Sequence, residues 1–329
     1  MSFGTFDFIK YTLGSVGEKR SIVVTHKQSG NQKEFKTRTE FYGHWAKKSG
    51  GWLGEQNKGR DTPWTVDDFT IEDKQVAEPL EICLSSVKKY IEAVNEKLGA
   101  TSYYGYIGKG DSWRVEASTI LKYKGQREGT LKPIHLEAIE DYLKKNHAAI
   151  FIRGKEADDQ VVIDATEDPE LIVIGVDKDY RGCQIKLFNP DKMGEPEVIK
   201  GFGKLYIGSD KMVRGEGRIF LYHQVLSQDS SDNYAANSAS DIKWADKSSF
   251  AVLSKCSTDK QALEGMVEAY KKLYPEPKVI TGWRGDKFEI DWKYVMQENF
   301  TMAHMLRHDD DRFVLTDVLD KLEIDYELQ

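Results

Sequence analysis

Acidic residues gather in three short clusters of this chain. They read Glu156-Ala157-Asp158-Asp159, Asp177-Lys178-Asp179 and Asp229-Ser230-Ser231-Asp232. Seven carboxylates brought close together repel strongly unless divalent cations neutralise them. Carboxylate oxygens without His or Cys partners suit hard ions such as Mg²⁺ or Mn²⁺ rather than zinc. Two such ions about 3.5–4 Å apart are a recurring device for cleaving phosphodiesters, so the clusters predict a metal-dependent nuclease.

Each cluster alone also has an ordinary structural interpretation. Acids are favoured at a helix N-terminus, where Glu156 and Asp159 would share one face. The second cluster is compatible with a simple turn, and the third with helix capping. All three lie beside the expected end of a strand or helix, and this shared placement favours a common site.

A second candidate feature combines cations with aromatic residues. Trp113-Arg114 is followed by Lys122-Tyr123-Lys124-Gly125-Gln126-Arg127. Arg114, Lys122, Lys124 and Arg127 would meet phosphates, while Tyr123 would stack on a base. The alternative is a surface helix with a packed tyrosine, which composition alone favours.

Composition limits the class of protein. The 329 residues are 40% hydrophobic and 31% charged, as in a soluble globular chain, and no apolar run reaches the ~18–20 residues of a membrane span. The first residues do not resemble a signal peptide, and three isolated cysteines fit a reducing cytoplasm. The net charge of −7 is unusual for nucleic-acid binding. However, seven acids belong to the clusters, and residues 109–155 hold ten Lys and Arg against six Asp and Glu.

The expected elements place the acids at one edge of a sheet. Strand and helix patterns alternate across residues 100–190, which indicates an α/β layer with a parallel sheet. The continuous apolar run 171–176 is typical of a buried parallel strand, and sites in such sheets lie beyond the carboxyl ends of the strands. The other expected elements are strands at 2–9, 103–107 and 148–152, hairpins at 21–40 and 279–290, an irregular insertion at 41–76, and helices at 77–98, 133–145, 216–227, 241–273, 292–307 and 315–322.

Other catalytic motifs are excluded. Residues 105–110 look phosphate-binding, but Tyr103 and Gly110 occupy positions where a P-loop needs Gly and Ser or Thr. His304 and His308 have a ligand spacing without a third ligand, which favours surface histidines. No motif supports Ser-His-Asp catalysis.

The motifs together resemble the 5′ nuclease superfamily. This family includes flap endonucleases, bacteriophage 5′–3′ exonucleases and the 5′ nuclease domain of bacterial DNA polymerase I. The resemblance rests on Tyr123–Arg127, Glu156–Asp159, Val176–Asp179 and Gln228–Asn233, whose order and spacing agree over about residues 105–235. It implies a PIN-like α/β core with a helical arch.

The resemblance also implies roles for individual residues. Glu156, Asp158 and Asp159 would hold one Mg²⁺, and Asp177, Asp179, Asp229 and Asp232 the second, with Mn²⁺ as a possible substitute. Asp7 would add a carboxylate from the first strand. Lys124 and Arg127 would contact the scissile phosphate beside Asp177, and the partner would be DNA with a 5′ end, as duplex or flap, in phage-type replication or degradation. The resemblance does not imply binding to a membrane.

Three positions depart from the family pattern. Thr5 stands where the family's first-strand Asp belongs, and Tyr106-Ile107-Gly108 lacks the acid that normally precedes the arch. Residues 234–240 lack the glycines of the family's helix-hairpin-helix. Two rivals therefore stay open: a catalytically impaired nuclease-like protein that binds nucleic acid without cleaving it, and a phosphatase-like hydrolase of small nucleotides. The predicted domains are an α/β core at 1–240, with an insertion at about 15–78 and an arch at about 109–147, and a mainly helical region at 241–329.

Overall fold

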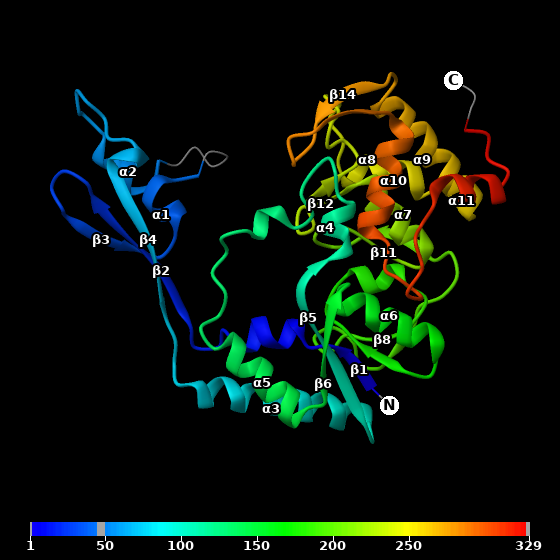
Figure 1. Ribbon diagram of the computed structural model, residues 1–329, viewed down its shortest axis with the longest axis horizontal. Coiled ribbons are helices and arrows are strands. Elements are labelled where there is room, and N and C mark those ends of the chain that lie inside the picture. Colours follow the sequence, from blue (N-terminus) through cyan, green and yellow to red (C-terminus); the bar gives the residue numbers. More distant parts are fainter. Residues whose placement is uncertain (1, 45–49, 327–329) are drawn as a thin grey trace. The chain divides into compact units, whose positions relative to one another are not determined.

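A six-stranded sheet forms the centre of the α/β fold. The computed structural model describes residues 2–44 and 50–326. The sheet has the order β6-β5-β1-β7-β8-β9, and every pair is parallel except the last (Figure 1). This confirms the predicted parallel-sheet α/β core. Its strands are β1 (Ser2–Thr5), β5 (Tyr103–Ser112), β6 (Ala149–Gly154), β7 (Ile172–Ile174), β8 (Lys186–Phe188) and β9 (Glu197–Val198).

Apolar residues of the middle strands hold the sheet to α6 (Ala157–Glu167). Ile107, Val173 and Leu187 are at most 1% exposed, and α6 buries Val161, Val162 and Ile163. Burial of such side chains stabilises the fold by about 1.5–3 kcal/mol each. The first turn of α6 is thereby fixed at the carboxyl ends of the strands.

A second apolar core is built by the C-terminal helices around α7 (Arg218–Leu226). Seven of the nine α7 residues are buried, because helices pack on several of its sides. The surrounding elements are α8 (Asp246–Leu253), α9 (Asp259–Leu273), α10 (Trp292–Ala303) and α11 (Leu315–Lys321), with three hairpins: β10 (Lys204–Ile207) with β11 (Val213–Glu216), β12 (Gln228–Asp229) with β13 (Tyr234–Ala235), and β14 (Lys278–Thr281) with β15 (Lys287–Ile290). The predicted hairpin at 279–290 is confirmed.

The chain divides into two compact units. The first comprises residues up to 8, 91–131 and 143 onward; the second comprises residues 9–90 and 132–142. The C-terminal helices thus fall in the same unit as the central sheet. The predicted domain boundary at residue 240 stays a prediction.

The second unit contains a small antiparallel β-module, defined here as residues 19–76. Its sheet has the order β3-β2-β4, formed by β2 (Lys19–His26), β3 (Gln32–Phe35) and β4 (Phe69–Val76), and it also holds α1 (Arg38–Tyr42) and α2 (Gly51–Gln56). The predicted hairpin at 21–40 is therefore confirmed. The prediction of an irregular insertion at 41–76 is wrong for β4, whose many charged residues conceal its strand pattern. Residues 45–49 of this range lie outside the described residues.

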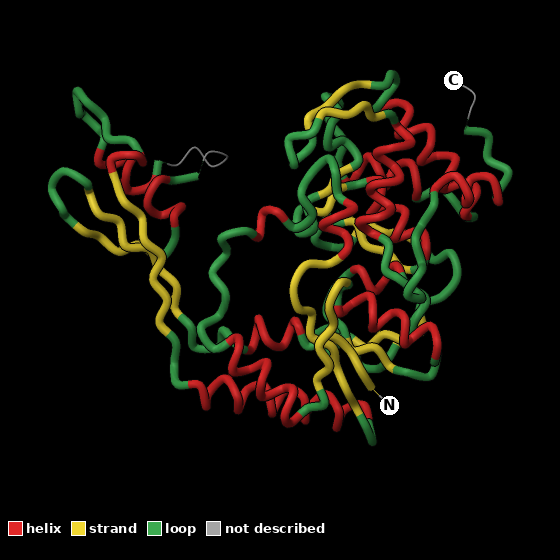
Figure 2. The backbone as a smooth tube through the Cα atoms, viewed as in Figure 1, coloured by secondary structure: helices red, strands yellow, loops and turns green. Residues whose placement is uncertain are grey.

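Two further expectations change. The first strand ends at Thr5, and a π-helix occupies Ile9–Leu13. The predicted helical arch contains two α-helices, α4 (Trp113–Ala117) and α5 (Leu136–Asn146). The backbone between them is a loop with one short 3₁₀ turn (Figure 2). The predicted helix at 77–98 is present as α3 (Leu80–Leu98). In the part of the chain that the structure describes, no helix is both long and apolar enough to cross a membrane.

Candidate active site

The acids lie where the parallel strands end. Asp7 follows β1 by two residues, and its backbone N–H donates to the Thr5 hydroxyl at 3.1 Å. Its carboxylate accepts from the Gly108 backbone N–H at 3.2 and 3.3 Å. A Cβ at Gly108 would lie 3.0 Å from Asp7 Oδ2, so glycine lets the neighbouring strand approach the acid. Asp7 is therefore held at the same sheet edge as the first two clusters.

The first cluster begins α6 with a capping box. The Asp159 carboxylate accepts from the Glu156 backbone N–H at 3.2 Å, and the Glu156 side chain accepts from the backbone of residue 159. Because the helix N-terminus carries partial positive charge, it accommodates these acids. This local pattern explains both Glu156 and Asp159, but it does not engage Asp158.

Asp158 lies in an electrostatically costly environment. The Tyr180 hydroxyl donates to Asp158 Oδ1 at 2.5 Å. The pKa of Asp158 is raised to about 8, first by burial and then by the charges of Asp177, Glu156 and Asp7, against the lowering effect of the Tyr180 bond. Among the described residues no lysine or arginine pairs with Asp158. A proton or a metal cation is therefore needed to relieve the repulsion.

Asp179 repeats this pattern across the site. Burial raises its pKa well above the usual value, followed by the charge of Asp177, and Lys178 opposes the shift. The Asp179 backbone N–H donates to Asp177 Oδ1 at 3.0 Å, and Gln224 donates to the Asp179 carboxylate. Asp177 itself is exposed at the end of the β7 segment.

The third cluster is a tight turn between β12 and β13. Asp229 Oδ1 accepts from the backbone N–H groups of Ser231 at 2.7 Å and Asp232 at 3.1 Å. Lys178 Nζ lies 2.7 Å from Asp229 Oδ2, so the second and third clusters are joined by an ion pair. Asp229 is 4% exposed, and burial raises the pKa of Asp232.

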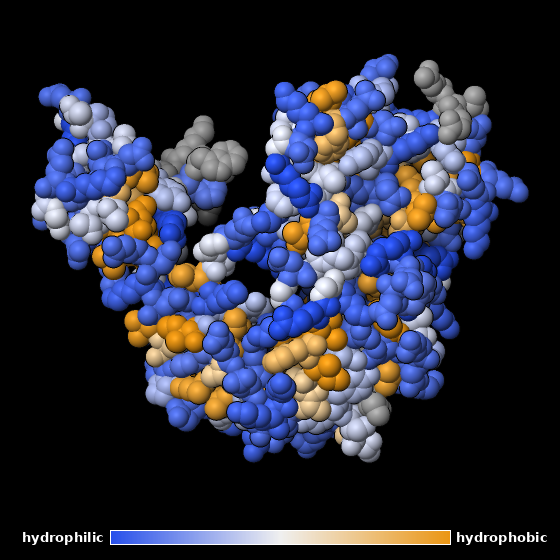
Figure 3. All heavy atoms as spheres, viewed as in Figure 1, coloured by the Kyte–Doolittle hydropathy of each residue, from blue (hydrophilic) through white to orange (hydrophobic). Residues whose placement is uncertain are grey.

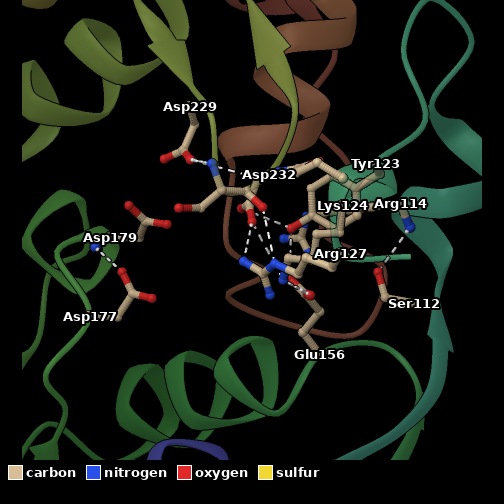
Figure 4. A network of polar contacts seen from close by, with 12 residues as sticks. Ser112, Arg114, Tyr123, Lys124, Arg127, Glu156, Asp177, Asp179, Asp229 and Asp232 are labelled. Atoms are coloured by element: carbon tan, nitrogen blue, oxygen red, sulfur yellow. Dashed lines mark hydrogen bonds and ion pairs between the residues drawn. The ribbon is translucent and has the colours of Figure 1, made fainter. Parts of the chain in front are cut away.

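Lys124 and Arg127 lie against these acids (Figure 4). Lys124 Nζ pairs with Glu156 and lies 3.6 Å from Asp232 Oδ1, while Arg127 Nη2 lies 3.3 Å from Asp232 Oδ1. The loop is also fixed by its backbone, because the Lys124 N–H donates to the Asp232 carbonyl at 3.1 Å and Asn233 Nδ2 donates to the Lys122 carbonyl at 2.9 Å. Burial lowers the pKa of Lys124, but the charges of Glu156 and Asp232 outweigh it and raise this pKa. Burial likewise raises the pKa of Glu156, but the charges of Lys124 and Arg114 outweigh it and lower this pKa.

Two of the predicted nucleic-acid contacts, Arg114 and Tyr123, are buried in the structure. Arg114 is 2% exposed and forms hydrogen bonds of 2.7 Å from Nη1 and Nη2 to Asp159, so it is not presented to a phosphate. Tyr123 is 3% exposed and donates to Glu156 at 2.9 Å and Asp232 at 3.0 Å, so its ring is not presented to a base. Lys122 pairs with Glu128 at the surface, outside the acidic site.

Asp159, a predicted metal ligand, is buried and accepts hydrogen bonds from several donors. Besides the two bonds from Arg114, its oxygens accept from the backbone N–H groups of Leu306 at 3.1 Å and Glu156 at 3.2 Å. Four donors leave the carboxylate no lone pair directed at an ion. The pKa of Asp159 is lowered, because Arg114 and the backbone donors outweigh its burial.

The remaining carboxylates are of the chemical type that binds divalent cations. Asp7, Asp158, Asp177 and Asp179 offer only hard oxygen ligands, and burial together with the charge of Asp177 raises the pKa values of Asp158 and Asp179. Within residues 2–44 and 50–326, no three His, Cys, Asp or Glu side chains converge closely enough to hold one ion. Binding would therefore draw these side chains together.

Sequence reasoning missed the residues that position the acids. Tyr180 bonds Asp158, Gln224 bonds Asp179, and Lys178 bridges to Asp229. A Cβ at Gly175 would lie 2.4 Å from the Tyr180 ring, which explains a glycine directly after β7. Of these residues, only Lys178 could have been noticed in the sequence, because it is a cation between two acids.

The chain is similar to solved structures of bacteriophage nucleases at low sequence identity. Among solved structures it is similar to a mutant of the 5′-exonuclease of bacteriophage T5, with 15% sequence identity, 72% of this chain and 89% of that chain covered, and a TM-score of 0.40. It is also similar to the flap endonuclease of bacteriophage T5 in a pseudo-enzyme–product complex with DNA and metal ions, with 14% identity, 72% and 87% covered, and a TM-score of 0.42. No protein-family model and no curated protein matches the sequence.

Proposed function

We propose that the chain is a divalent-metal-dependent nuclease that hydrolyses DNA phosphodiester bonds near 5′ ends, as a 5′–3′ exonuclease or a flap endonuclease. The main support is the burial of Asp158 close to Asp177, Glu156 and Asp7, which together raise the pKa of Asp158 to about 8. An uncompensated acidic site at the carboxyl ends of parallel strands is suited to ions that bind phosphate. A role in phage-type DNA replication or degradation belongs to this proposal.

The proposed metal ligands are Asp7, Asp158, Asp177 and Asp179, with Glu156, Asp229 and Asp232 nearby. Bound Mg²⁺ would supply a nucleophilic water and neutralise charge on the phosphate. Lys124 is 26% and Arg127 53% exposed at the side chain, so both can exchange carboxylate partners for phosphate oxygens. Their positive charge would then stabilise the pentavalent transition state.

A second candidate function is nucleic-acid binding without cleavage. The observation that favours it is the pairing of Lys124 with Glu156, Lys178 with Asp229 and Arg127 with Asp232, because internal cations already satisfy these acids. The absence of a ready group of three ligands in the described residues agrees with it. Such a protein would bind DNA in EDTA and in Mg²⁺ alike.

One experiment separates the candidates. The purified chain is incubated with 5′-labelled duplex, flap and single-stranded DNA, and with RNA, in Mg²⁺, Mn²⁺ or EDTA. The nuclease predicts products only with metal; mononucleotides indicate an exonuclease, and fragments of flap length indicate an endonuclease. Retained binding without products in any metal would support the second candidate.

A further inference from the structure

Positive charge is concentrated in one segment of the β-module. Residues 19–60 hold ten Lys and Arg against three Asp and Glu, a surplus of seven in a chain whose net charge is −7. The rest of the chain therefore carries −14. Such an asymmetry between segments of one chain is the electrostatic footprint of a polyanion-binding region.

Two tryptophans of the module lie beneath cations. The Arg60 guanidinium carbon is 3.5 Å from the ring centre of Trp64, and Lys33 Nζ is 5.1 Å from that of Trp52. Both tryptophans contact the Phe69 ring, at centroid distances of 6.2 Å for Trp52 and 5.6 Å for Trp64. The two cation–tryptophan pairs are thus neighbours on one aromatic cluster.

The module has an apolar core of its own. The apolar side chains Ile22, Val24, Phe35, Phe41, Leu53 and Phe69 are all buried and form the core of the module. Lys33, Lys36 and Arg60 are exposed, and no described carboxylate forms an ion pair with them. Hydrophilic side chains cover most of the visible face of the module around a smaller apolar patch (Figure 3).

The opposite face of the sheet has a different character. Glu34 there bonds Ser21 and pairs with Lys74 at 2.8 Å, and Glu72 stands opposite Val23. Charge on that face is thus largely balanced. Lys33 lies with Phe35 on the side of the aromatic cluster, because alternate residues of a strand share a face, and Lys36 is the first residue after that strand.

We propose that Lys33, Lys36, Arg60 and the two tryptophans Trp52 and Trp64 form an accessory nucleic-acid-binding surface. It rests on the proposed function only in taking nucleic acid as the partner. The cations would contact backbone phosphates without reading sequence, and the half-buried tryptophans would offer stacking contacts to unpaired bases. The surface binds and does not cleave.

The test uses the whole chain in EDTA, which removes the divalent metal that the proposed cleavage requires. Binding of labelled single-stranded and duplex DNA is measured over a range of salt concentrations. The variant carries Lys33→Glu, Lys36→Glu and Arg60→Glu; the control carries Lys192→Glu, Lys247→Glu and Lys255→Glu, three exposed lysines of the other unit. Both change the net charge equally, so a difference between them is local.

We expect the variant to bind at least tenfold more weakly than the control. The slope of log affinity against log salt should fall by about 2–3, because each lost phosphate contact removes about 0.7–0.9. A greater loss for single strands would assign the tryptophans a stacking role. Glutamine at the same three positions should give a smaller loss with unchanged thermal unfolding, which separates lost binding from misfolding.

Two results would overturn the proposal. Equal losses in variant and control would mean that only net charge matters. Equal competition by polyglutamate would assign the surface to an acidic polypeptide instead. Neither result depends on cleavage: a chain that never cuts DNA can still show the expected loss, and an active nuclease can lack it.

Discussion

Arg114 and Asp159 face each other through two hydrogen bonds of 2.7 Å, and both side chains are almost wholly shielded from solvent. The pair also ties the sheet edge to the loop after α10, because Arg114 Nη2 donates to the His304 carbonyl at 2.5 Å and the Leu306 N–H donates to Asp159. Residues from three distant parts of the sequence are thereby fixed around the start of α6. We interpret this pair as the structural support of the acidic site.

Arg114→Ala should destabilise the fold by about 3–5 kcal/mol, because it leaves the Asp159 charge buried without a partner. Arg114→Met combined with Asp159→Leu removes both charges and should recover a large part of this loss. Denaturant unfolding measures both variants. A single substitution that costs under 1 kcal/mol would mean that the pair is not the support we describe.

Lys124→Ala should slow cleavage by about 10²–10³-fold, because it removes a cation placed to stabilise charge on the phosphate. The same change should tighten divalent-cation binding, since Glu156 and Asp232 lose an internal competitor. Calorimetry with Mg²⁺ or Mn²⁺ gives the affinity and single-turnover cleavage gives the rate. Lys122→Ala is the matched control, because its partner is the surface residue Glu128. Weaker metal binding in Lys124→Ala would contradict the competition.

Metal-free stability should fall as pH rises from about 5 to 8. The pKa of Asp158 is about 8 in the folded chain and near 3.9 when unfolded, so the folded state favours the neutral form and loses that advantage as the carboxyl ionises. The loss should be on the order of 1–3 kcal/mol. Asp158→Asn should flatten this part of the profile, and Mg²⁺ should reduce the slope of the wild-type chain. A flat metal-free profile would show that Asp158 is not crowded.

The stability of the fold should also fall at low pH, for a different reason. The pKa values of Asp159 and Asp311 are lowered in the fold, so their stabilisation is present above the unfolded pKa and is lost as pH falls through the folded values. Asp311 accepts from His304 Nε2 at 2.9 Å and from Arg307 Nε at 2.8 Å. Asp311→Asn should therefore cost stability at pH 7 and lose less on acidification than the wild-type chain does, as followed by thermal unfolding at each pH.

Tyr180→Phe should weaken metal binding at neutral pH. The hydroxyl favours the ionised form of Asp158, so its loss raises the pKa of that carboxyl further and leaves less carboxylate to bind an ion. The acidic limb of the cleavage profile should move to higher pH. Tyr222→Phe is the control, because that hydroxyl bonds Asp259 outside the acidic site. Equal metal affinity in both variants would exclude the coupling.

The sequence predicted where the acids gather but not how each is used. The end of a buried strand can be predicted from its apolar run, and the position of Asp177 beyond β7 was predicted in this way. The roles of Arg114, Tyr123 and Asp159 did not, because burial depends on partners far along the chain, such as His304 and Leu306. For the same reason an exposed cation and a buried one look alike in sequence.

The insertion at 41–76 shows a second limit. The strand β4 (Phe69–Val76) pairs with β2 across more than forty residues, and charged side chains on its open face hide the alternation. Nothing local marks Lys33 and Arg60 as neighbours of tryptophan rings. Both facts come from tertiary packing, which local patterns do not encode.

Cleavage of 5′-labelled duplex and flap DNA by the Asp177→Asn chain, compared with wild type, tests the central claim most directly. Asp191→Asn serves as an exposed control outside the acidic site, and Mg²⁺ is compared with EDTA for each protein. The proposed nuclease predicts metal-dependent products from wild type and the control, and a loss of at least 10²-fold in Asp177→Asn with unchanged thermal unfolding. Equal product from Asp177→Asn, or product that persists in EDTA, would contradict a metal-dependent active site at the carboxyl ends of these strands.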